Sequence, residues 1–337
     1  MPESLNDMGE FGLIRRIDEL LKREGVQAPG VTLGIGDDTA SFKARSGYEI
    51  LVTCDAVVEG RHFLSRHISP MELGRRCMML NISDIGAMGG HPLYALISLG
   101  LKNETLVTDI EDMYRGFLAE LRPFGASIIG GNLTKSGDGI FIDITLIGEV
   151  EEGRAVRRSG ARPGDVILVT GYPGHSAAGL QLLVQSLVSE DHPLVRDYNK
   201  PSHRAREGRA VALTGCARAM IDTSDGFLGD LGHICEESKV GALLVQEKFP
   251  VSEELKEAAK MLKREPEEFF LCDSDDYQLI IACVEKDVDL IRAAIALTYS
   301  GPVTEVGQVT APEEGIRLLL PDGSKVSLSA KGWDHFR

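Results

Sequence analysis

The chain has 337 residues, and 51 acidic against 36 basic side chains leave it a formal net charge of −15 at pH 7. So large an acid excess argues against a protein that binds nucleic acid or an anionic membrane, because either partner requires a basic surface. A composition of 43% hydrophobic and 26% charged residues is globular and excludes disordered, collagen-like and coiled-coil classes. No apolar run approaches the roughly 20 residues that cross a bilayer, and residues 1–10 lack the basic and apolar blocks of a signal peptide. We therefore expect a cytoplasmic protein whose partners are cations, or anions presented with a cation.

Strand-like and helix-like patterns alternate along the chain, which favours mixed α and β layers. At about 150 residues per domain, the length predicts two domains. Strands are expected at residues 49–53, 93–101, 127–129, 140–150, 166–170, 241–245 and 279–284. Helices are expected at residues 12–23, 70–88, 110–124, 177–189, 227–237, 252–262 and 287–297. The charged, glycine-containing stretch 151–165 is the predicted domain boundary, and residues 192–207 are expected to form a loop, either a lid or a plain surface connection.

Apolar, strand-like runs end at aspartate in five places along the chain. The aspartates concerned are Asp37, Asp38, Asp55, Asp84, Asp222, Asp225, Asp273, Asp275 and Asp276. One such residue alone is usually a turn former or a helix cap. Carboxylates brought together from five places would repel one another unless divalent cations neutralised them, and hard oxygen ligands suit Mg²⁺. Since Mg²⁺ usually shares its coordination shell with substrate phosphates, the pattern predicts a nucleotide polyphosphate as ligand.

Asp84 gives the sharpest local argument for a cation. Ser69, Pro70 and Glu72 form a capping box that predicts the start of a helix. Asp84 then falls on the apolar, core-facing stripe of that helix, where a carboxylate is costly unless a cation or hydrogen-bond donors meet it. The alternative, an ion pair with the arginines near the helix start, would have to span more than two helical turns.

Asp222 and Asp225 give a second local argument. A strand is expected to end at Ile221 and a helix to begin near Ser224. The free amides of a helix start favour anions or their metal complexes. In the plain alternative Ser224 caps the helix and Asp225 complements its dipole, but that explanation does not need Asp222.

The chain lacks the usual nucleotide-binding signatures. It has no Walker A sequence, no protein-kinase loop set and no GxSxG elbow, so a nucleotide must be held in another way. The pair Gly130 and Gly131 could let backbone approach a phosphate, although such pairs are more often turns. Arg158 either neutralises phosphate oxygens or lies in a solvated turn. His62 is a ligand contact or an ordinary loop histidine, and Trp333 either stacks on a planar heterocycle or anchors the tail.

Taken in chain order, these motifs resemble the thiamine-monophosphate kinase family. The segments that carry the resemblance are 9–11, 34–38, 55–63, 81–89, 130–131, 158–160, 222–226, 276–277 and 331–336. They run from the first ten residues to the last seven, with similar spacing. The family belongs to the superfamily of aminoimidazole ribonucleotide synthetase, selenophosphate synthetase and a hydrogenase maturation factor, which use ATP without a P-loop.

The resemblance implies a two-domain α+β fold like that of aminoimidazole ribonucleotide synthetase. Residues 1–150 would form an N-terminal domain that binds ATP and magnesium and pairs its sheet with a second copy in a homodimer. Residues 151–337 would form a C-terminal α/β domain. The implied reaction transfers the γ-phosphoryl group of ATP to thiamine monophosphate, giving thiamine diphosphate and ADP. A phosphate oxygen is already a competent nucleophile, so we expect no general base, and the aspartates should be ligands of several magnesium ions.

The same resemblance assigns individual residues. Magnesium ligands are expected at Asp38, Thr53, Cys54, Asp55, Asp84, Asn132, Asp222 and Asp225. ATP contacts are expected at Tyr114, Gly131, Asn132, Arg158 and Ser224, and contacts to the thiamine compound at His62, Asp275 and Trp333. The chain departs from the family pattern at Asn132, where aspartate is usual, at Cys54, where threonine is common, and at 273–277, where Gly-Gly-Glu-Asp-Tyr is usual. A paralogous ATP-using enzyme with another small acceptor, and a nucleotide or thiamine-phosphate binding protein with little turnover, are the alternatives.

Overall fold

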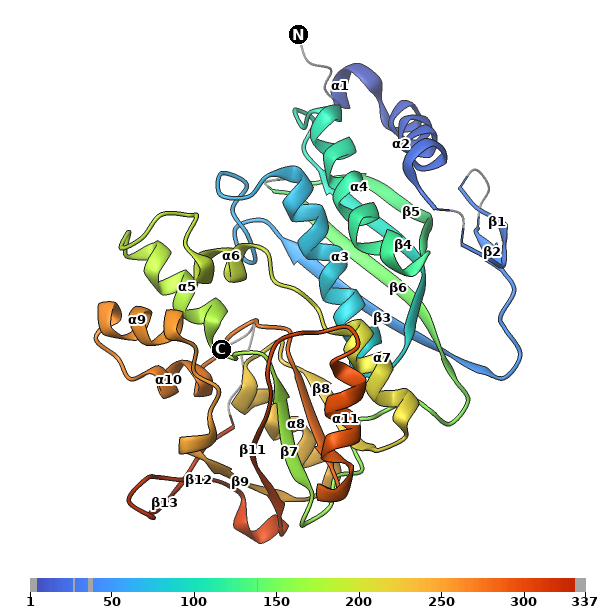
Figure 1. Ribbon diagram of the computed structural model, residues 1–337. Coiled ribbons are helices and arrows are strands. Elements are labelled where there is room, and N and C mark those ends of the chain that lie inside the picture. The colour runs from blue at the N-terminus through green and yellow to red at the C-terminus, as the bar shows by residue number, and fades with distance from the viewer. Residues whose placement is uncertain (1–4, 27, 36–38, 138, 331–337) are drawn as a thin grey trace. The chain divides into compact units, whose positions relative to one another are not determined.

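A computed structural model describes residues 5–26, 28–35, 39–137 and 139–330, so the expected ligands Asp38 and Trp333 lie outside the described residues. The chain divides into two compact units, drawn as ribbons in Figure 1. The first consists of Met1–Ile85 and Gly90–Gly153, and the second of Gly86–Gly89 and Arg154–Arg337. None of the described helices is long and apolar enough to cross a membrane.

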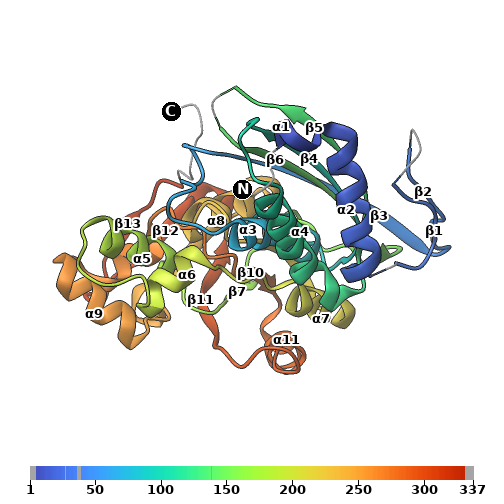
Figure 2. The ribbon, with the colours of Figure 1, turned by 90° about the horizontal axis from the view of Figure 1, so that it is seen from above.

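The first unit is a four-stranded sheet with helices against one face (Figures 1 and 2). Its strand order is β3-β6-β4-β5, in which only the β4 and β5 pair is parallel. The strands are β3 (Tyr48–Val58), β4 (His91–Leu101), β5 (Ser127–Lys135) and β6 (Phe141–Glu151), and β1 (Val31–Leu33) pairs separately with β2 (Ser41–Phe42). The helices are α1 (Leu5–Met8), α2 (Glu10–Glu24), α3 (Pro70–Ala87), α4 (Val107–Leu121) and the 3₁₀ turn η1 (Arg122–Phe124).

Side chains along β3 alternate between a covered and an uncovered face of this sheet. Leu51 and Val57 are buried, whereas Val52 is 63% exposed. A period of two with one buried side is typical of a sheet that is covered on one face only. The uncovered face, as this unit presents it, carries the exposed apolar residues Ile50, Val52, Val58 and Phe141.

Two glycines let α3 and α4 approach each other closely. A Cβ atom added at Gly74 would lie 2.1 Å from the carbonyl oxygen of Met113, and one added at Gly116 would lie 2.1 Å from that of Met71. Both obstacles are backbone atoms, which cannot rotate away as a side chain can. Close packing of this kind fixes the position of α3, the helix that carries Asp84.

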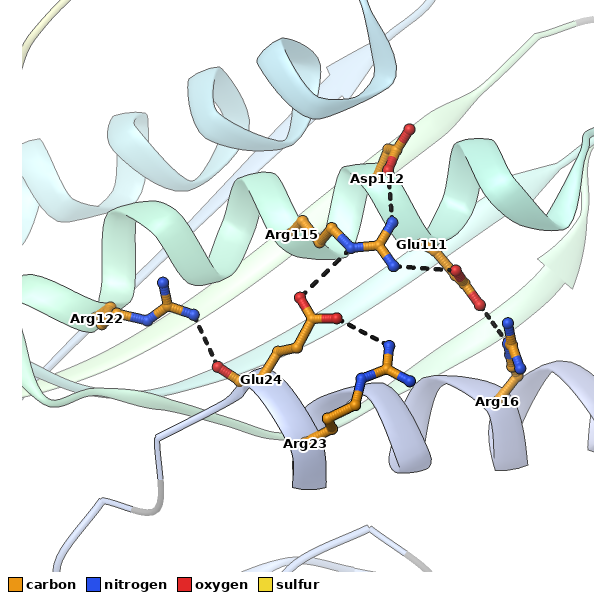
Figure 3. Close-up of polar contacts among 7 residues, drawn as sticks. All are labelled: Arg16, Arg23, Glu24, Glu111, Asp112, Arg115 and Arg122. Carbon is orange, nitrogen blue, oxygen red and sulfur yellow. Dashed lines mark hydrogen bonds and ion pairs between the residues drawn. The ribbon is translucent and has the colours of Figure 1, made fainter.

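A network of ion pairs joins α2 to α4 (Figure 3). Arg115 lies at its centre, and its guanidinium donates to Asp112 at 2.6 Å and to Glu111 at 3.2 Å. It also pairs with Glu24, the last residue of α2, at 3.4 Å. Glu111 is buried and pairs in addition with Arg16 of α2. Because a buried carboxylate is costly without partners, the network holds α2 in one position on α4.

The second unit is a seven-stranded sheet with helices on both faces. Its strand order is β13-β12-β9-β11-β7-β10-β8, in which β12 and β9 are parallel and the other pairs antiparallel. The strands are β7 (Val166–Thr170), β8 (Ala217–Asp222), β9 (Gly241–Val245), β10 (Leu279–Cys283), β11 (Val303–Thr310), β12 (Ile316–Leu319) and β13 (Lys325–Ser327). The helices are α5 (His175–Val184), α6 (Pro193–Asn199), α7 (Ala205–Thr214), α8 (Phe227–Ser238), α9 (Glu253–Leu262), α10 (Pro266–Leu271) and α11 (Val288–Ile295).

Burial on both faces explains why β7 is apolar without alternation. Ile167 and Val169 pack in one core cluster with Phe227 of α8. Leu168 packs on the other face, in a cluster that contains Ile291 of α11. A central strand covered on both sides needs apolar residues at every position.

The predicted strands and helices are confirmed in chain order, with ends shifted by a few residues. The predicted start of α3 at Pro70 is confirmed, and Ser69 Oγ accepts the Glu72 N–H at 3.3 Å, which is one of the two hydrogen bonds of the predicted capping box. The loop predicted at 192–207 is wrong, because α6 occupies much of it and α7 begins within it. Pro193 at the first helical position and His192, whose side chain accepts the Leu194 N–H, are the start signal that was overlooked.

The change from first to second unit falls between Gly153 and Arg154, inside the stretch 151–165. The mixed α and β architecture expected for both parts of the chain is confirmed. The division into a dimer-forming domain at 1–150 and an α/β domain at 151–337, with their separate roles, stays a prediction.

The close contact of α3 with α4 predicts that Gly116→Ala lowers the free energy of unfolding by about 1–3 kcal/mol, the usual range for overpacking. Alanine is the better helix former by about 1 kcal/mol, so the overpacking cost must exceed that gain. Gly12→Ala on α2 is the control, because its Cβ atom would meet only the flexible side chain of Met8. Urea denaturation of both variants measures the difference, and equal stability of the two would contradict the packing argument.

Candidate functional site

The first unit brings Thr53, Asp55 and Asp84 together. Thr53 Oγ1, on β3, donates a hydrogen bond to Asp84 Oδ2, on α3, at 2.5 Å. Burial, together with the neighbouring carboxylates of Asp84 and Asp143, raises the pKa of Asp55 to about 7. Two carboxylates that compete in this way are relieved by a cation with oxygen ligands, and Mg²⁺ is such a cation.

The arginine alternative for Asp84 receives no support from Arg75. The Arg75 guanidinium instead pairs with Glu120 of α4, with Nε 2.7 Å from Oε1. Asp84 is half-buried and has the hydroxyl of Thr53 as a donor. Asp84 is therefore partly buried, accepts a hydrogen bond from Thr53 and lies close enough to Asp55 to raise the pKa of that carboxyl, and this environment suits a cation ligand.

Cys54 lies on the other face of the sheet from this group. Successive residues of a strand point to opposite faces, so the thiol projects away from the side chains of Thr53 and Asp55. Its Sγ donates to Asp143 Oδ1 at 3.1 Å, and Thr145 Oγ1 donates to Sγ at 3.5 Å. The side chain of Cys54 therefore does not join Thr53, Asp55 and Asp84.

Asn132 shares that uncovered face with Cys54. The register places Ala56 opposite Asp143, Asp143 opposite Ser98, and Ser98 opposite Asn132, in one row across the four strands. Residues in one row project to the same face, and Ala56 projects to the same face as Cys54. The structure thus separates the side chain of Asn132, which is exposed, from the carboxylates of Asp55 and Asp84.

The two other expected nucleotide contacts of this unit have structural explanations. Tyr114 is buried in α4, where its ring packs edge-on against that of Phe117 with 5.4 Å between centroids, and burial raises its pKa. A Cβ atom added at Gly131 would lie 2.0 Å from the carbonyl oxygen of Ile97. Glycine at this position is thus required by the pairing of β5 with β4, whether or not a phosphate binds there.

His62 belongs to a tight loop that follows β3. Its Nδ1 accepts the N–H of Val58 at 3.0 Å, so the Nε2 atom carries the proton of the neutral imidazole. Glu59 holds the loop to the start of β6, because its Oε2 accepts the Ile140 N–H at 2.9 Å and pairs with Lys102 at 3.4 Å. The loop is therefore a defined structure that presents a half-buried histidine.

The second unit gathers a second set of carboxylates where β8 ends and α8 begins. Asp222 is buried at the end of β8, and Asp225 lies in the turn that follows. The N–H of Asp225 donates to Oδ2 of Asp230, which is also buried, at 3.1 Å. Burial and the carboxylate of Asp222 raise the pKa of Asp230 to about 8, while Arg158 opposes the shift. Asp222, Asp225 and Arg158 therefore all act on Asp230.

Asp230 and His233 are candidate ligands that the sequence argument missed. The ligand atoms of Asp225, Asp230 and His233 all lie within 4.8 Å of one another, close enough to hold one divalent cation. Asp230 and His233 stand three residues apart on α8 and so share a helix face. A carboxylate and a histidine three residues apart, in the helix that follows the strand-ending Asp222, are the sequence pattern that could have predicted these ligands.

Ser224 does not cap α8, contrary to the plain alternative. The N-cap residue is Gly226, with φ of 104°, and no side chain caps this helix. A Cβ atom at Gly226 would lie 2.6 Å from the carbonyl oxygen of Cys272, so only glycine fits. Ser224 remains half-buried in the turn beside Asp225, and capping does not explain its presence.

The acidic stretch 273–276 caps helix α5. Asp276 is buried and accepts the N–H groups of Gly174 at 2.6 Å and Ser176 at 2.9 Å. Asp275 accepts a hydrogen bond from the Ser176 hydroxyl, and Ser274 Oγ accepts the Ala177 N–H at 3.0 Å. Carboxylates at a helix start are stabilising, so the structure gives this segment an architectural role. The expected contact of Asp275 with a thiamine compound stays a prediction.

Comparison with known proteins covers both units. Residues 36–150 match the family described as AIR synthase related protein, N-terminal domain, and residues 162–318 match the corresponding C-terminal domain. The thiamine-monophosphate kinase of Bacillus subtilis (strain 168) is 31% identical over 335 residues, which cover 98% of this chain and all of the relative.

Two solved structures resemble the chain over nearly its whole length. The crystal structure of thiamine-monophosphate kinase from Stenotrophomonas maltophilia has a TM-score of 0.80 at 29% identity, covering 94% of this chain and 98% of the other. The structure of AaThiL complexed with AMPPCP and TMP has a TM-score of 0.74 at 33% identity, covering 99% of each.

The raised pKa of Asp55 predicts how stability depends on pH. A carboxyl whose pKa moves from 3.8 to about 7 on folding binds its proton more tightly in the folded chain. Metal-free protein should therefore lose stability as the pH rises from about 4 to about 7, by up to about 4 kcal/mol. Asp55→Asn should remove the part of the loss that Asp55 causes, whereas the part caused by the raised pKa of Asp230 remains in both proteins. Urea denaturation with a chelator at a series of pH values tests this, and parallel profiles for wild type and variant would show the prediction wrong.

Proposed function

The chain belongs to the thiamine-monophosphate kinase family of AIR synthase-related proteins, and we propose that the acidic clusters of its two units hold the magnesium ions of the phosphoryl transfer. It is an enzyme that phosphorylates thiamine monophosphate to thiamine diphosphate with ATP as the donor. The observation that carries the proposal is the placement of Asp84, which is hydrogen-bonded to Thr53 and lies near enough to Asp55 to raise the pKa of that carboxyl, since a divalent cation would relieve the two carboxylates.

The proposed ligands in the first unit are Thr53, Asp55 and Asp84, with Asp38 added on the resemblance alone. Mg²⁺ prefers hard oxygen ligands and keeps several waters, so two carboxylates and a hydroxyl leave coordination positions for phosphate oxygens. In the second unit we propose Asp222 and Asp225 as ligands. Ser224, in the turn between β8 and α8, is proposed to contact ATP. Arg158, whose charge acts on Asp230 of α8, is proposed to contact ATP as well.

Bound magnesium would neutralise the charge of the phosphates, and the chain's own residues would do the rest. A phosphate oxygen of thiamine monophosphate is itself the nucleophile, so no residue needs to remove a proton. The aspartates would hold the ions, which would supply positive charge to the phosphates, and Arg158 would offer a guanidinium to phosphate oxygens. Alignment and charge neutralisation are the main contributions to phosphoryl transfer.

We further propose that the uncovered face of the first unit's sheet pairs with a second copy. Ile50, Val52, Val58 and Phe141 are exposed on that face, and covering them would remove apolar surface from water. Cys54 and Asn132 project to the same face, so they would lie at or beside this interface. A homodimer would thus explain why these two side chains face away from Asp55 and Asp84.

The departure at 273–277 does not by itself call for a different acceptor. Asp276 and Ser274 cap α5 in this chain, so the changes there preserve the start of a helix. The paralogous enzyme and the binding protein without turnover therefore gain no specific support from this segment.

Asp84→Asn tests the proposed cation site through product formation. Removing one carboxylate from the pair should lower the rate of thiamine diphosphate formation by about 100-fold, because charge stabilisation in the transition state is lost. Chromatographic measurement of thiamine diphosphate, from purified protein with MgATP and thiamine monophosphate, gives the rate. Asp18→Asn, which breaks only an exposed ion pair with Lys22 on α2, is the control. Equal rates for the two variants would rule Asp84 out as a ligand.

Asn132→Asp tests whether Asn132 takes part in cation binding from the uncovered face. One added charge within about 4 Å of a solvated ion is worth about 1 kcal/mol, or about fivefold in the magnesium concentration at half-maximal rate. Because Asn132 projects to the other face of the sheet from Asp55 and Asp84, we expect this concentration to stay as in wild type, and a fivefold fall would contradict the proposed ligand set. The same change at Asn103, in a turn of the first unit, should have no effect. If the Mg²⁺ dependence of the Asn132 variant matches wild type, Asn132 has no part in cation binding.

A further inference from the structure

Asn81 of α3 carries a buried acceptor with no donor. Its side chain is 0% exposed, and its Oδ1 has no hydrogen-bond partner. Thr310 Oγ1 is the other buried side-chain atom in this condition among the described residues. Buried polar atoms are nearly always paired, so an orphan usually marks an ion or a water that completes the site.

The orientation of the Asn81 amide is fixed by its other end. Nδ2 donates to the carbonyl oxygen of Cys77, one turn earlier, at 3.2 Å. A carbonyl oxygen can only accept, so the amide cannot be turned round without losing this bond. Oδ1 is therefore the atom that lacks a partner, and the group it lacks is a donor or a cation.

Asn81 lies on the helix face that looks toward the carboxylate pair. Cys77 precedes it by four residues and Asp84 follows it by three, so the three side chains are neighbours along α3. Asp84 accepts a hydrogen bond from Thr53 of β3, and Thr53 and Asp55, two residues apart on that strand, project to the same face. The orphan acceptor thus lies one helical turn from Asp84, on the side of α3 that meets Thr53.

A hydrated cation at Asp55 and Asp84 would supply the missing donor. Mg²⁺ keeps several waters when it binds to protein carboxylates, and each such water has protons to donate. Groups that hold the outer side of a metal's coordination shell are a regular part of metal sites.

We propose that Asn81 is a positioning residue of the first unit's magnesium site, where its Oδ1 accepts a hydrogen bond from a water bound to the ion. The proposal rests on the function given above, because it requires a cation at Asp55 and Asp84. It accounts for a buried amide where an apolar side chain would otherwise be favoured. It also explains why Asn81 Oδ1 has no partner in the structure, because the donor would be a water bound to the ion.

Cation binding without nucleotide tests this directly. Mn²⁺, a divalent ion that also takes oxygen ligands, serves as the probe, and the paramagnetic resonance signal of the free ion gives the bound amount. The variants are Asn81→Leu, which removes the acceptor at similar size, and Asn81→Asp, which keeps an acceptor. The Mn²⁺ binding that Asp84→Asn loses is the binding that belongs to this site. Thr310→Val, which removes the other orphan atom, is the matched control.

Asp84→Asn should abolish Mn²⁺ binding at this site. We expect Asn81→Leu to lower the Mn²⁺ affinity of the same site by about tenfold or more. Asn81→Asp should retain Mn²⁺ binding at this site, and Thr310→Val should bind Mn²⁺ as tightly as wild type does. Thermal unfolding gives a second readout: Asn81→Leu should be at least as stable as wild type without metal, but should gain less from added Mg²⁺. A purely structural role would give the opposite order, with lost stability and unchanged binding. If Asn81→Leu fails to fold, Asn81→Ala makes the same comparison.

The outcomes separate this inference from the function on which it rests. If Asp84→Asn loses Mn²⁺ while Asn81→Leu binds it as tightly as wild type, Asn81 has no such role and the cation site stands. If Asp84→Asn also binds as wild type does, there is no cation at Asp84 and both proposals fail.

Discussion

Repulsion between carboxylates held close together out of water is the constraint on which this structure depends. Asp55 competes with Asp84 in the first unit, and Asp222 competes with Asp230 in the second. Neither group is stable as a set of bare anions, because burial removes the solvent that would screen them. An enzyme that transfers a phosphoryl group from one phosphorylated molecule to another meets the same difficulty with its substrates. Divalent cations bound between the carboxylates and the phosphates would relieve both, as we propose.

The packing that forces these carboxylates together does not involve them. Gly74 and Gly116 bring α3 against α4, which fixes the helix that carries Asp84. In the second unit Gly226 starts α8 directly after the turn from β8, in a backbone conformation that favours glycine. Side chains on elements fixed in this way cannot move apart to reduce their repulsion, so the acidic groups stay poised for cations.

Much of the fold and part of the site could be predicted from the sequence, for physical reasons. Asp84 was readable because a helix start and an apolar stripe are local patterns. The opposite directions of Thr53 and Cys54 follow from strand alternation, yet the family resemblance had placed both on the metal. The role of Asp276 could not be predicted, since it caps a helix by accepting the N–H of Ser176, 100 residues earlier in the chain. The closeness of Asp225 to His233 was likewise not predictable, because it depends on the course of the turn between β8 and α8.

Anomalous diffraction from crystals grown with Mn²⁺ and a non-hydrolysable ATP analogue tests the central claim most directly. The account predicts one peak within about 2.0–2.3 Å of carboxylate oxygens of both Asp55 and Asp84, and another beside Asp222 and Asp225. Peaks confined to other parts of the chain, with these four carboxylates far from any ion, would contradict it.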